Sequence, residues 1–489
     1  MMVEFSRRSL RSRKRRRQIN AAGFAALFAL LPHQPVSAES LREALSAAYH
    51  GNPKLDAERA KLRATDEDVA RAESGYRPIV EGSAEIGHQR ASSEPRSATA
   101  GESNPWGYTL SIRQPVFQGY RTQNGVAEAE ATVKAGRENL RLVESTVLLE
   151  AVRAYMDVVT AASIVRIRNA NVSVLAQELD AANTRRSVKE VTKTDVAQAQ
   201  ARHARAVASA DLAKADLKSA AADYERVIGH APGGTAMPPM KLKFLPRSLE
   251  EAWGIAERQS PNLASALYRE EAARFAVDKV RGELLPEVNV EASYGHRENP
   301  NSAFDQQDSA SISGRVSVPL YDGGEIRARV RQAKHTQVSR VQEIEQARTE
   351  TVAQVTSAWS ALSGQRAKLK SDAIQVDANR IALEGTREEE KVGQRTLLDV
   401  LNAEQEYLDA QIEHANSRRE VVVASYQLLA AMGSLTAEDI LLTTTIYDPE
   451  QHLLDARENW FGIDITGADG RSQTYQADDR DVDVTDIVE

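Results

Sequence analysis

The feature that most constrains this chain is an internal duplication. Residues 40–44 (SLREA) recur as residues 248–252 (SLEEA), a shift of 208 positions. Further along, a shift of 204 positions places Trp359 where the first copy has Tyr155. A period of about 200 residues is far longer than the 20–50 residues of solenoid and propeller repeats. The chain therefore consists of two copies of one unit, joined by a Pro- and Gly-rich linker at residues 231–247.

Each copy has the same order of expected elements. The first spans residues 39–230 and the second residues 248–445. Each opens with a helical stretch, residues 41–73 or 249–283, in which apolar residues recur about every 3.6 positions. The spacing then changes to every second position, as in strands, and returns to about 3.6. We expect the strands at residues 78–90, 105–117, 286–297 and 310–321, and two long helical hairpins at residues 119–229 and 324–433. The sequence thus predicts a mainly helical fold with four strands per chain.

The strands carry one apolar and one polar face. Val80, Ala84 and Ile86 alternate with Glu81 and Glu85. Amphipathic strands of roughly 9–11 residues are typical of membrane β-barrels, although a half-buried soluble sheet has the same pattern. Small membrane barrels need about eight strands, so four strands would have to combine with those of other copies.

The N-terminus reads as an export signal. Residues 1–38 contain eight basic residues, then an apolar stretch at residues 21–31 and the small-residue cleavage motif Val36-Ser37-Ala38. The whole chain has a net charge of -8, and the signal contributes +7, so the remainder carries -15. An acidic exported chain is a poor candidate for binding nucleic acid, and we expect no such partner. Residues 446–489 end in an aspartate-rich run, which predicts a disordered tail.

No pattern for catalysis is present in the sequence. The chain has no cysteine, which excludes disulfides, thiolate metal sites and a catalytic thiol. It contains no phosphate-binding loop, nucleophile elbow or zinc-protease motif. His88 and His296 share a repeat position, but two histidines are weak support for a metal site. We therefore expect neither an enzyme nor a resident metal or cofactor.

Several motifs make the duplication more specific. They are residues 114–119 (QPVFQG) with residues 318–324 (VPLYDGG), residues 194–196 (TDV), and residues 392–401 (VGQRTLLDVL). Together with the duplication they resemble the TolC family of outer-membrane channel proteins over residues 40–445. The resemblance implies a homotrimer with a barrel of roughly 12 strands, four from each chain. It also implies that the barrel continues into a periplasmic α-helical tunnel.

The resemblance also implies a function and partners. The protein is expected in the outer membrane of a Gram-negative bacterium, with a large periplasmic part. There it would be the exit duct of a tripartite efflux or type I secretion system. An inner-membrane efflux pump or ABC transporter and a periplasmic adaptor would deliver small molecules or proteins to it. The alternative is a soluble periplasmic coiled-coil adaptor without a channel, but two hairpins and membrane-type strands argue against it.

The resemblance implies site residues at the hairpin turns. Family members close the periplasmic end through links between neighbouring hairpins, which here implies a contact of Arg395 with Thr194 or Asp195 of a neighbouring copy. Acidic rings line the constriction. Two residues depart from the usual pattern: Glu390 stands where a tyrosine often sits, and Asn402 where a second aspartate often sits. The expected residues are Thr194, Asp195, Glu390 and Arg395 for the gate, Asp399 and Asn402 for ion selectivity, and Val191, Val392 and Gly393 for adaptor docking.

Simpler local roles exist for some of these residues. Arg395 and Asp399 are four residues apart and could pair on one helix face for about 0.2–0.5 kcal/mol. Thr194 could be the N-cap of the following helix.

Overall fold

A computed structural model describes most of the chain beyond its N-terminal segment. The chain divides into two units, Met1–Ser37 and Ala38–Glu489, and the predicted export signal at residues 1–38 lies outside the described residues. The structure describes residues 39–92, 94–95, 99–234, 236–238, 245–440, 442, 445–461, 463, 465–466 and 472–473.

The first copy folds into helices and strands in the predicted order. Its elements are α1 (Leu41–Gly51), α2 (Pro53–Glu73), the 3-10 helix η1 (Ser74–Tyr76), β1 (Ile79–Ile86), β2 (Gln89–Ala91), β3 (Gly101–Ser103), β4 (Trp106–Gln118), α3 (Arg121–Ser187) and α4 (Lys193–Ile228).

The second copy repeats this plan with a longer strand pair. Its elements are α5 (Leu249–Gln259), α6 (Pro261–Gly282), β5 (Glu287–Asn301), β6 (Phe304–Ser317), α7 (Glu325–Lys391) and α8 (Leu397–Met432). A helix α9 (Gln451–Glu458) and the two-residue strands β7 (Ile465–Thr466) and β8 (Ser472–Gln473) follow.

Each opening helical stretch is two helices and not one. A proline at the first position of α2 and of α6 has no N–H to donate, so each helix restarts there. Asn52 and Ser260 cap the new helices, accepting hydrogen bonds from the backbone N–H groups of Lys54 and Leu263.

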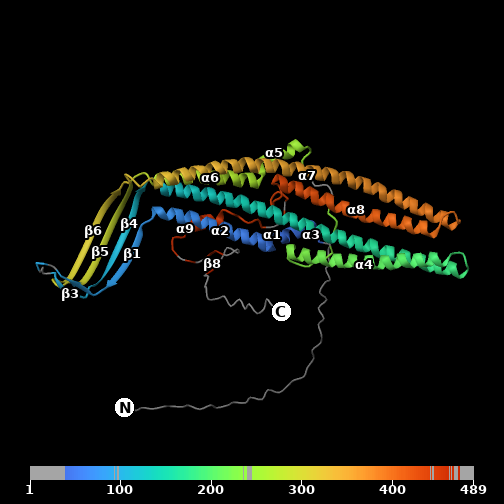
Figure 1. The fold of residues 1–489 in the computed structure, drawn as a ribbon, viewed down its shortest axis with the longest axis horizontal. Coiled ribbons are helices and arrows are strands. Elements are labelled where there is room, and N and C mark those ends of the chain that lie inside the picture. Colours follow the sequence, from blue (N-terminus) through green and yellow to red (C-terminus); the bar gives the residue numbers. More distant parts are fainter. Residues whose placement is uncertain are drawn as a thin grey trace, which may run out of the picture. The chain divides into compact units, whose positions relative to one another are not determined.

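The four long strands form one antiparallel sheet in the order β1-β4-β5-β6 (Figure 1). The β4–β5 pair joins the two copies, with Leu110 opposite Tyr294. β1 and β6 are the edges of this sheet within the part of the chain that the structure describes. Apolar side chains on the sheet are open to the surroundings, as for Ile312, which is 83% exposed.

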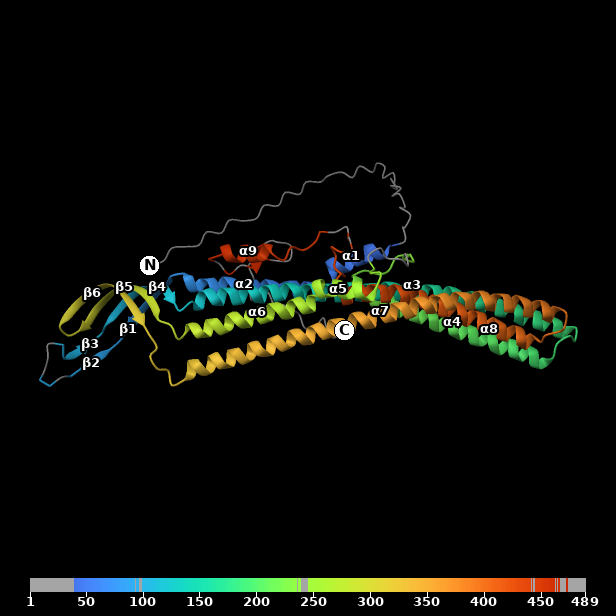
Figure 2. The same ribbon diagram turned by 90° about the horizontal axis from the view of Figure 1, so that it is seen from above.

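The long helices form two hairpins that extend away from the sheet (Figure 2). α3 and α7 have 67 residues each, or about 100 Å at 1.5 Å per residue. α4 and α8 have 36 residues each and end at Gly229 and Gly433, which take the left-handed conformation. α3 packs against α4 and α8, which brings the two hairpins together. Among the described helices, none combines the length and apolar character needed to cross a membrane.

The main core lies where the short helices meet the hairpins. Tyr155 of α3 and Tyr224 of α4 are fully buried there, together with Met432 at the end of α8. The hydroxyl oxygen of Tyr155 lies 2.7 Å from the carbonyl oxygen of Glu39 and 2.6 Å from that of Ala236. These contacts attach the start of the described chain and the linker to α3.

The prediction of a disordered tail is wrong for its first part. α9 packs along α2, and Tyr447 and Leu453 contact the main core. Arg457 forms ion pairs with Glu73 and Glu130. The aspartate-rich run begins only at Asp478, outside the described residues, so its composition does not represent residues 445–461.

Candidate functional site

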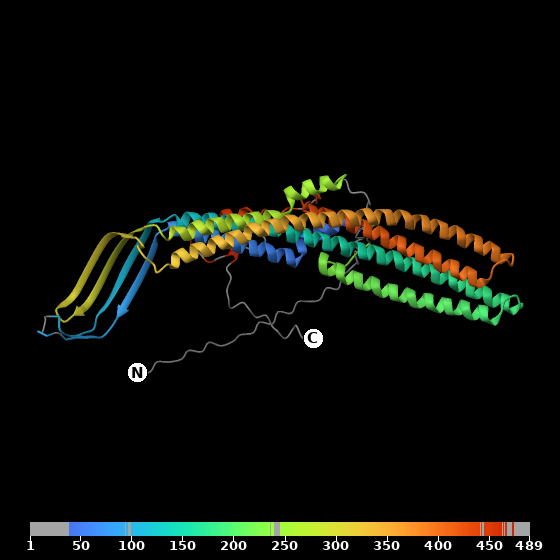
Figure 3. The same cartoon turned by 45° about the horizontal axis from the view of Figure 1, so that its top comes forward.

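The two hairpin turns lie together at the end of the helices away from the sheet (Figures 1, 2 and 3). Each turn contains one left-handed residue, Lys189 with φ 69° in the first and Gly393 with φ 77° in the second. Both close through the same backbone hydrogen bond, 2.9 Å long, from the N–H of Glu190 or Gln394 to a carbonyl five residues earlier. Two different sequences therefore adopt one turn geometry.

Each turn leads into a helix that begins with a capping box. The hydroxyl of Thr192 accepts a 3.2 Å hydrogen bond from the N–H of Asp195, whose carboxylate accepts one of 2.9 Å in return. Thr396 and Asp399 repeat this arrangement at 3.3 and 2.9 Å. The prediction that Thr194 is the N-cap is wrong, because the reciprocal bonds need a spacing of three residues before the aspartate. Thr194 is exposed on α4.

Asp399 is held in its ionised form. Its pKa lies below the ordinary value, first because the backbone N–H of Thr396 donates to the carboxylate, and also because the Arg395 cation is near. The side chain is half-buried at the start of α8. The same carboxylate therefore caps a helix and carries a stable negative charge at the turn.

Arg395 pairs within its own turn. Its Nε donates a 2.8 Å hydrogen bond to the Glu389 carboxylate, and both side chains are about half exposed. In the described part of the chain this is its ion pair, so the expected pairing with Asp399 along the helix is not formed. The predicted contact of Arg395 with Thr194 or Asp195 concerns a neighbouring copy and stays a prediction.

Two polar contacts connect the first hairpin to the second. Arg185, near the end of α3, forms an ion pair with Glu390 of α7, whose side chain is only 14% exposed. Arg202 of α4 donates a 2.9 Å hydrogen bond to the Asn402 side chain of α8. Both predicted departures from the family pattern, Glu390 and Asn402, thus take part in contacts between hairpins. The Arg185–Glu390 pair is partly buried and the Arg202–Asn402 bond is exposed, so the first should contribute more to holding the tips in register.

A third polar contact stabilises the second hairpin itself. Arg387 of α7 binds the carboxylate of Glu404 on α8. Glu404 is buried, and this burial raises its pKa.

The turns rest on a small apolar cluster. It is made by side chains of α3, α4 and α8: Leu175, Ala182, Val196, Ala199, Ala206, Leu397 and Leu401. Val191 is half-buried against this cluster, whereas Val392 is 70% exposed. Gly393 is exposed as well, and a Cβ on it would meet no atom within 4 Å. Of the three residues expected to dock an adaptor, Val392 and Gly393 are therefore presented at the surface.

Comparison with known proteins identifies the family. A model described as outer membrane efflux protein matches residues 44–230 and 254–434, which are the two copies of the repeat. The chain belongs to the outer membrane efflux protein family. The outer membrane efflux protein BepC of Brucella suis biovar 1 is 36% identical over 437 residues, which are 89% of this chain and 94% of the relative.

Two more distant proteins agree with this assignment. The outer membrane protein TolC of Escherichia coli is 24% identical over 83% of this chain and 84% of its own length. The CmeC outer membrane channel of Campylobacter jejuni superposes with a TM-score of 0.74 at 15% identity, covering 86% of this chain and 89% of that one. The predicted TolC-family resemblance and outer-membrane location are confirmed. The family is one of transport proteins, which favours the channel interpretation over the adaptor alternative.

Sequence reasoning missed the partners of the site residues in this efflux protein. Arg185 and Arg202 bind Glu390 and Asn402 across the hairpins. Neither arginine belongs to a recognisable motif. Both lie on long helices that carry many other charged residues. Only the relative register of the two hairpins selects them, and no local pattern encodes that register.

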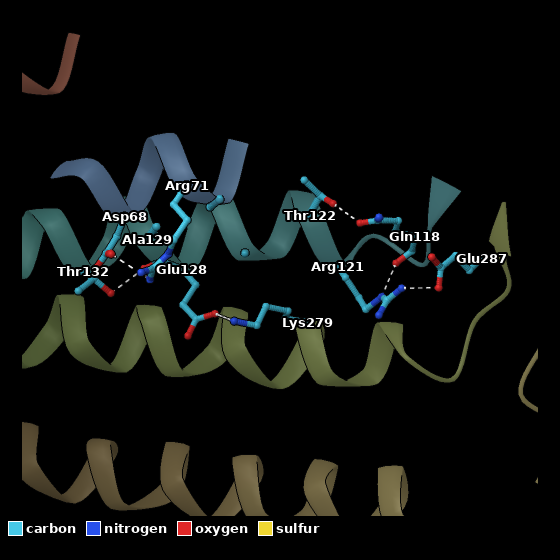
Figure 4. A pocket seen from close by; sticks show the side chains of 12 residues that line it. Asp68, Arg71, Gln118, Arg121, Thr122, Glu128, Ala129, Thr132, Lys279 and Glu287 are labelled. Atoms are coloured by element: carbon cyan, nitrogen blue, oxygen red, sulfur yellow. Dashed lines mark hydrogen bonds and ion pairs between the residues drawn. The ribbon is translucent and has the colours of Figure 1, made fainter. Parts of the chain in front are cut away.

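The efflux protein also has a polar cavity at the junction of helices and sheet. It measures about 550 Å³ and lies between α2, α3, α6 and the start of β5 (Figure 4). Its charged groups neutralise each other: Arg121 pairs with Glu287 at 2.9 Å, and Lys279 with Glu128 at 2.7 Å. No group of metal-ligating residues occurs among the described residues. We interpret the polar residues around this cavity as structural contacts that join the helices to the sheet.

Proposed function

We propose that three copies of this efflux protein assemble into one exit duct for small molecules. The observation that carries the proposal is the four-stranded sheet with β1 and β6 as open edges. Open edges expose unpaired backbone N–H and C=O groups, which a membrane interior does not tolerate. Four strands are too few to close on themselves, whereas three chains supply roughly 12 and remove every edge.

The subunit count tests this assembly. Native mass spectrometry of the detergent-solubilised protein is expected to give a complex of three chains. A mass equal to one chain in mild detergent would contradict the proposal.

The cargo and partners follow from the same proposal. The relative at 36% identity is named an efflux protein, and on this ground the proposal takes efflux as the role, with small molecules as the cargo. An inner-membrane pump would deliver them through a periplasmic adaptor that contacts the exposed turn at Val392 and Gly393. The proposal contains no catalytic step in this chain.

Cysteine cross-linking in cells tests the contact with the adaptor. The chain has no cysteine of its own, so Gly393→Cys introduces a single one, and we expect it to cross-link to the adaptor. Lys218→Cys, at an exposed position of α4, is the control.

The hairpin tips form the gate in this proposal. Arg395 is exposed and lies in a turn, so it can exchange Glu389 for Thr194 or Asp195 of a neighbouring copy. The Arg185–Glu390 and Arg202–Asn402 contacts would hold each pair of hairpins in the closed arrangement. Opening requires that such contacts break, so weakening them should increase the current.

Single-channel conductance in planar bilayers tests the gate. The wild-type protein is expected to conduct weakly, and Arg395→Ser to conduct several-fold more. Lys391→Ser is the matched control, because it removes one positive charge as well. Among the described residues, Lys391 pairs only with Glu388 of its own helix, at 2.7 Å. Equal currents in the wild type and Arg395→Ser would remove Arg395 from the gate.

A charge exchange tests the contact between hairpins. Glu390→Arg places two cations side by side and should raise the conductance. Adding Arg185→Glu restores an ion pair of reversed polarity and should lower it again. If the double variant conducts like Glu390→Arg alone, the Arg185–Glu390 pair does not hold the gate.

Asp399 would set the ion preference of the duct. Three copies would place three carboxylates around one opening, and such rings favour cations. Because its pKa lies below the ordinary 3.8, cation preference should be the same at pH 7 and pH 5. Asp399→Asn in the Arg395→Ser background should shift the reversal potential under a salt gradient, whereas Asp195→Asn, its counterpart in the repeat, should shift it less.

A further inference from the structure

Four apolar side chains after α9 are open to the surroundings. Trp460 is 59%, Phe461 90%, Ile463 88% and Ile465 52% exposed. We call these residues the C-terminal apolar patch. Single exposed apolar residues are common on proteins, but a run of large ones in one short segment marks a surface that binds something.

The patch is held at a defined level of the molecule. Ala456 of α9 is buried, and Arg457 forms ion pairs with Glu73 at the end of α2 and with Glu130 of α3. Figures 1 and 2 both show α9 beside the part of α2 that leads into β1. The end of α9, where the C-terminal apolar patch begins, is therefore anchored near the end of α2.

A cation–aromatic contact fixes the first residue of the patch. The guanidinium of Arg77 lies 4.2 Å from the centre of the Trp460 ring. Arg77 is two residues before Ile79, where β1 begins. Trp460 thus lies at the boundary between the helical part and the strands.

The same level carries other exposed aromatic and apolar groups. Tyr76, just before Arg77, is 55% exposed, Tyr120 after β4 is 58% exposed, and Leu320 and Tyr321 after β6 are 89% and 82% exposed. Aromatic side chains gather at the headgroup level of membrane proteins because one part of the ring is apolar and the other polar. Trp460, the first residue of the patch, lies at this level through its contact with Arg77.

The charges at this place select lipid as the occupant. Arg77 is half-buried, and its guanidinium contacts the Trp460 ring without an ion pair to any described carboxylate. A phospholipid offers a phosphate for the guanidinium, which keeps its contact with the Trp460 ring, and an acyl region for the apolar side chains. A second copy of the chain would cover the apolar groups but would leave the cation to find a carboxylate.

We propose that the C-terminal apolar patch inserts into the periplasm-facing leaflet of the outer membrane, with Arg77 against the phospholipid phosphates. The inference rests on the proposed function, which places the sheet across that membrane. In this arrangement the C-terminal segment is a peripheral membrane anchor, which α9 attaches to the wall of the duct.

Tryptophan quenching by brominated phospholipids in nanodiscs tests this anchor. The chain has 4 tryptophans, so Trp106→Phe, Trp253→Phe and Trp359→Phe together leave Trp460 as the reporter. A second variant with all four tryptophans replaced and Ile312→Trp reports on the apolar face of β6. We expect a blue-shifted Trp460 emission and strong quenching by bromines close to the headgroup, with weaker quenching by bromines deep in the acyl chains.

The controls separate failure of the anchor from failure of the membrane assignment. Quenching at position 312 without quenching of Trp460 would overturn the anchor and leave the sheet in the membrane. A blue-shifted Trp460 that no brominated lipid quenches would mean that protein covers the patch, which also overturns the anchor. Absence of quenching at both positions would overturn the proposed function as well.

A second pair of variants tests the chemistry of the contact. Phe461→Ser with Ile463→Ser should reduce the quenching of Trp460 several-fold, because two inserted side chains are lost. Leu212→Ser is the matched control. Leu212 is 68% exposed, and it lies on α4, which belongs to the first hairpin and not to the sheet. If the double substitution leaves the quenching unchanged, these side chains do not enter the bilayer.

Discussion

The helices α3 and α7 occupy the same place in the two copies of the repeat, yet their surroundings differ. Both have 67 residues, but α3 has 17 buried residues and α7 has 7. α3 packs against α1, α2, α4, α6 and α8, whereas α7 packs against α5, α6 and α8. The duplication has therefore conserved the length of the helix and not its environment.

The difference shows which faces are left for other copies of the chain. α7 exposes five large apolar side chains along its length: Val338, Val341, Val352, Ile374 and Ile381, from 42% to 63%. A helix with apolar groups on open faces fits a position at the edge of a protomer, where a neighbour covers them. α3 forms the centre of the protomer and α7 its boundary in the proposed trimer.

The largest effect expected from this comparison concerns Tyr155 and its repeat counterpart Trp359. Tyr155→Ala empties a fully buried position and should lower the free energy of unfolding by about 3–5 kcal/mol. Trp359 is half-buried, so Trp359→Ala should cost less than half as much. Urea unfolding in detergent, followed by circular dichroism, measures both. Equal losses would contradict the distinction between a central and a boundary helix.

Alkaline pH should destabilise the centre of the first copy. Burial raises the pKa of Tyr155 from 10.0 to about 12, so the folded state retains this proton where the unfolded state loses it. The stabilisation is complete below pH 10 and is lost as the pH rises toward 12, at most about 2–3 kcal/mol. Tyr155→Phe should reduce the slope of this part of the stability profile, and the neighbouring Tyr224, whose pKa burial also raises, should keep the remainder. Trp359→Phe, which removes no titrating group, is the control and should leave the slope unchanged.

The two capping boxes should be equal in strength, unlike the helices that precede them. Thr192→Ala and Thr396→Ala each remove the hydroxyl that accepts from the aspartate N–H, at 3.2 and 3.3 Å, and each keeps the backbone N–H that donates to the aspartate at 2.9 Å. Each should cost about 1 kcal/mol. Thr194→Ala, next to the first box but outside it, should cost less than about 0.5 kcal/mol. A clear difference between the two box variants would show that tertiary contacts, and not the cap, determine the effect.

Local signals explain what was predictable from the sequence. The strands were located by their period of two, and the ends of α4 and α8 by Gly229 and Gly433, because those features act within a few residues. The capping box at Thr192 follows the same kind of rule, yet the wrong threonine was favoured, since Thr194 belongs to the family motif and Thr192 does not.

Contacts between distant segments could not be predicted. Glu390 was placed at the gate, but its partner Arg185 lies 205 residues away and depends on the register of two hairpins. The packing of α9 was missed because composition averaged over residues 446–489 concealed its short apolar face, with Leu453 and Ala456. The average composition of a segment describes its overall polarity, whereas a few apolar side chains at the right spacing decide whether part of it packs against the protein.

The smallest expected effect concerns the left-handed residue of each turn. Lys189 carries a Cβ at φ 69°, which costs about 1 kcal/mol, whereas Gly393 at φ 77° avoids this cost. Lys189→Gly relieves the strain, but it also increases the entropy of the unfolded chain, so the net gain should be about 0.5 kcal/mol or less. A Cβ at position 393 meets no atom within 4 Å, so Gly393→Lys should lose about 1 kcal/mol through backbone strain. Hydrogen exchange at the turns measures this local change, and about 1 kcal/mol corresponds to roughly fivefold faster exchange at Gln394. An unchanged exchange rate in Gly393→Lys would contradict this expectation. The second turn would then accept a side chain at its left-handed position without a loss of stability, as the first turn does.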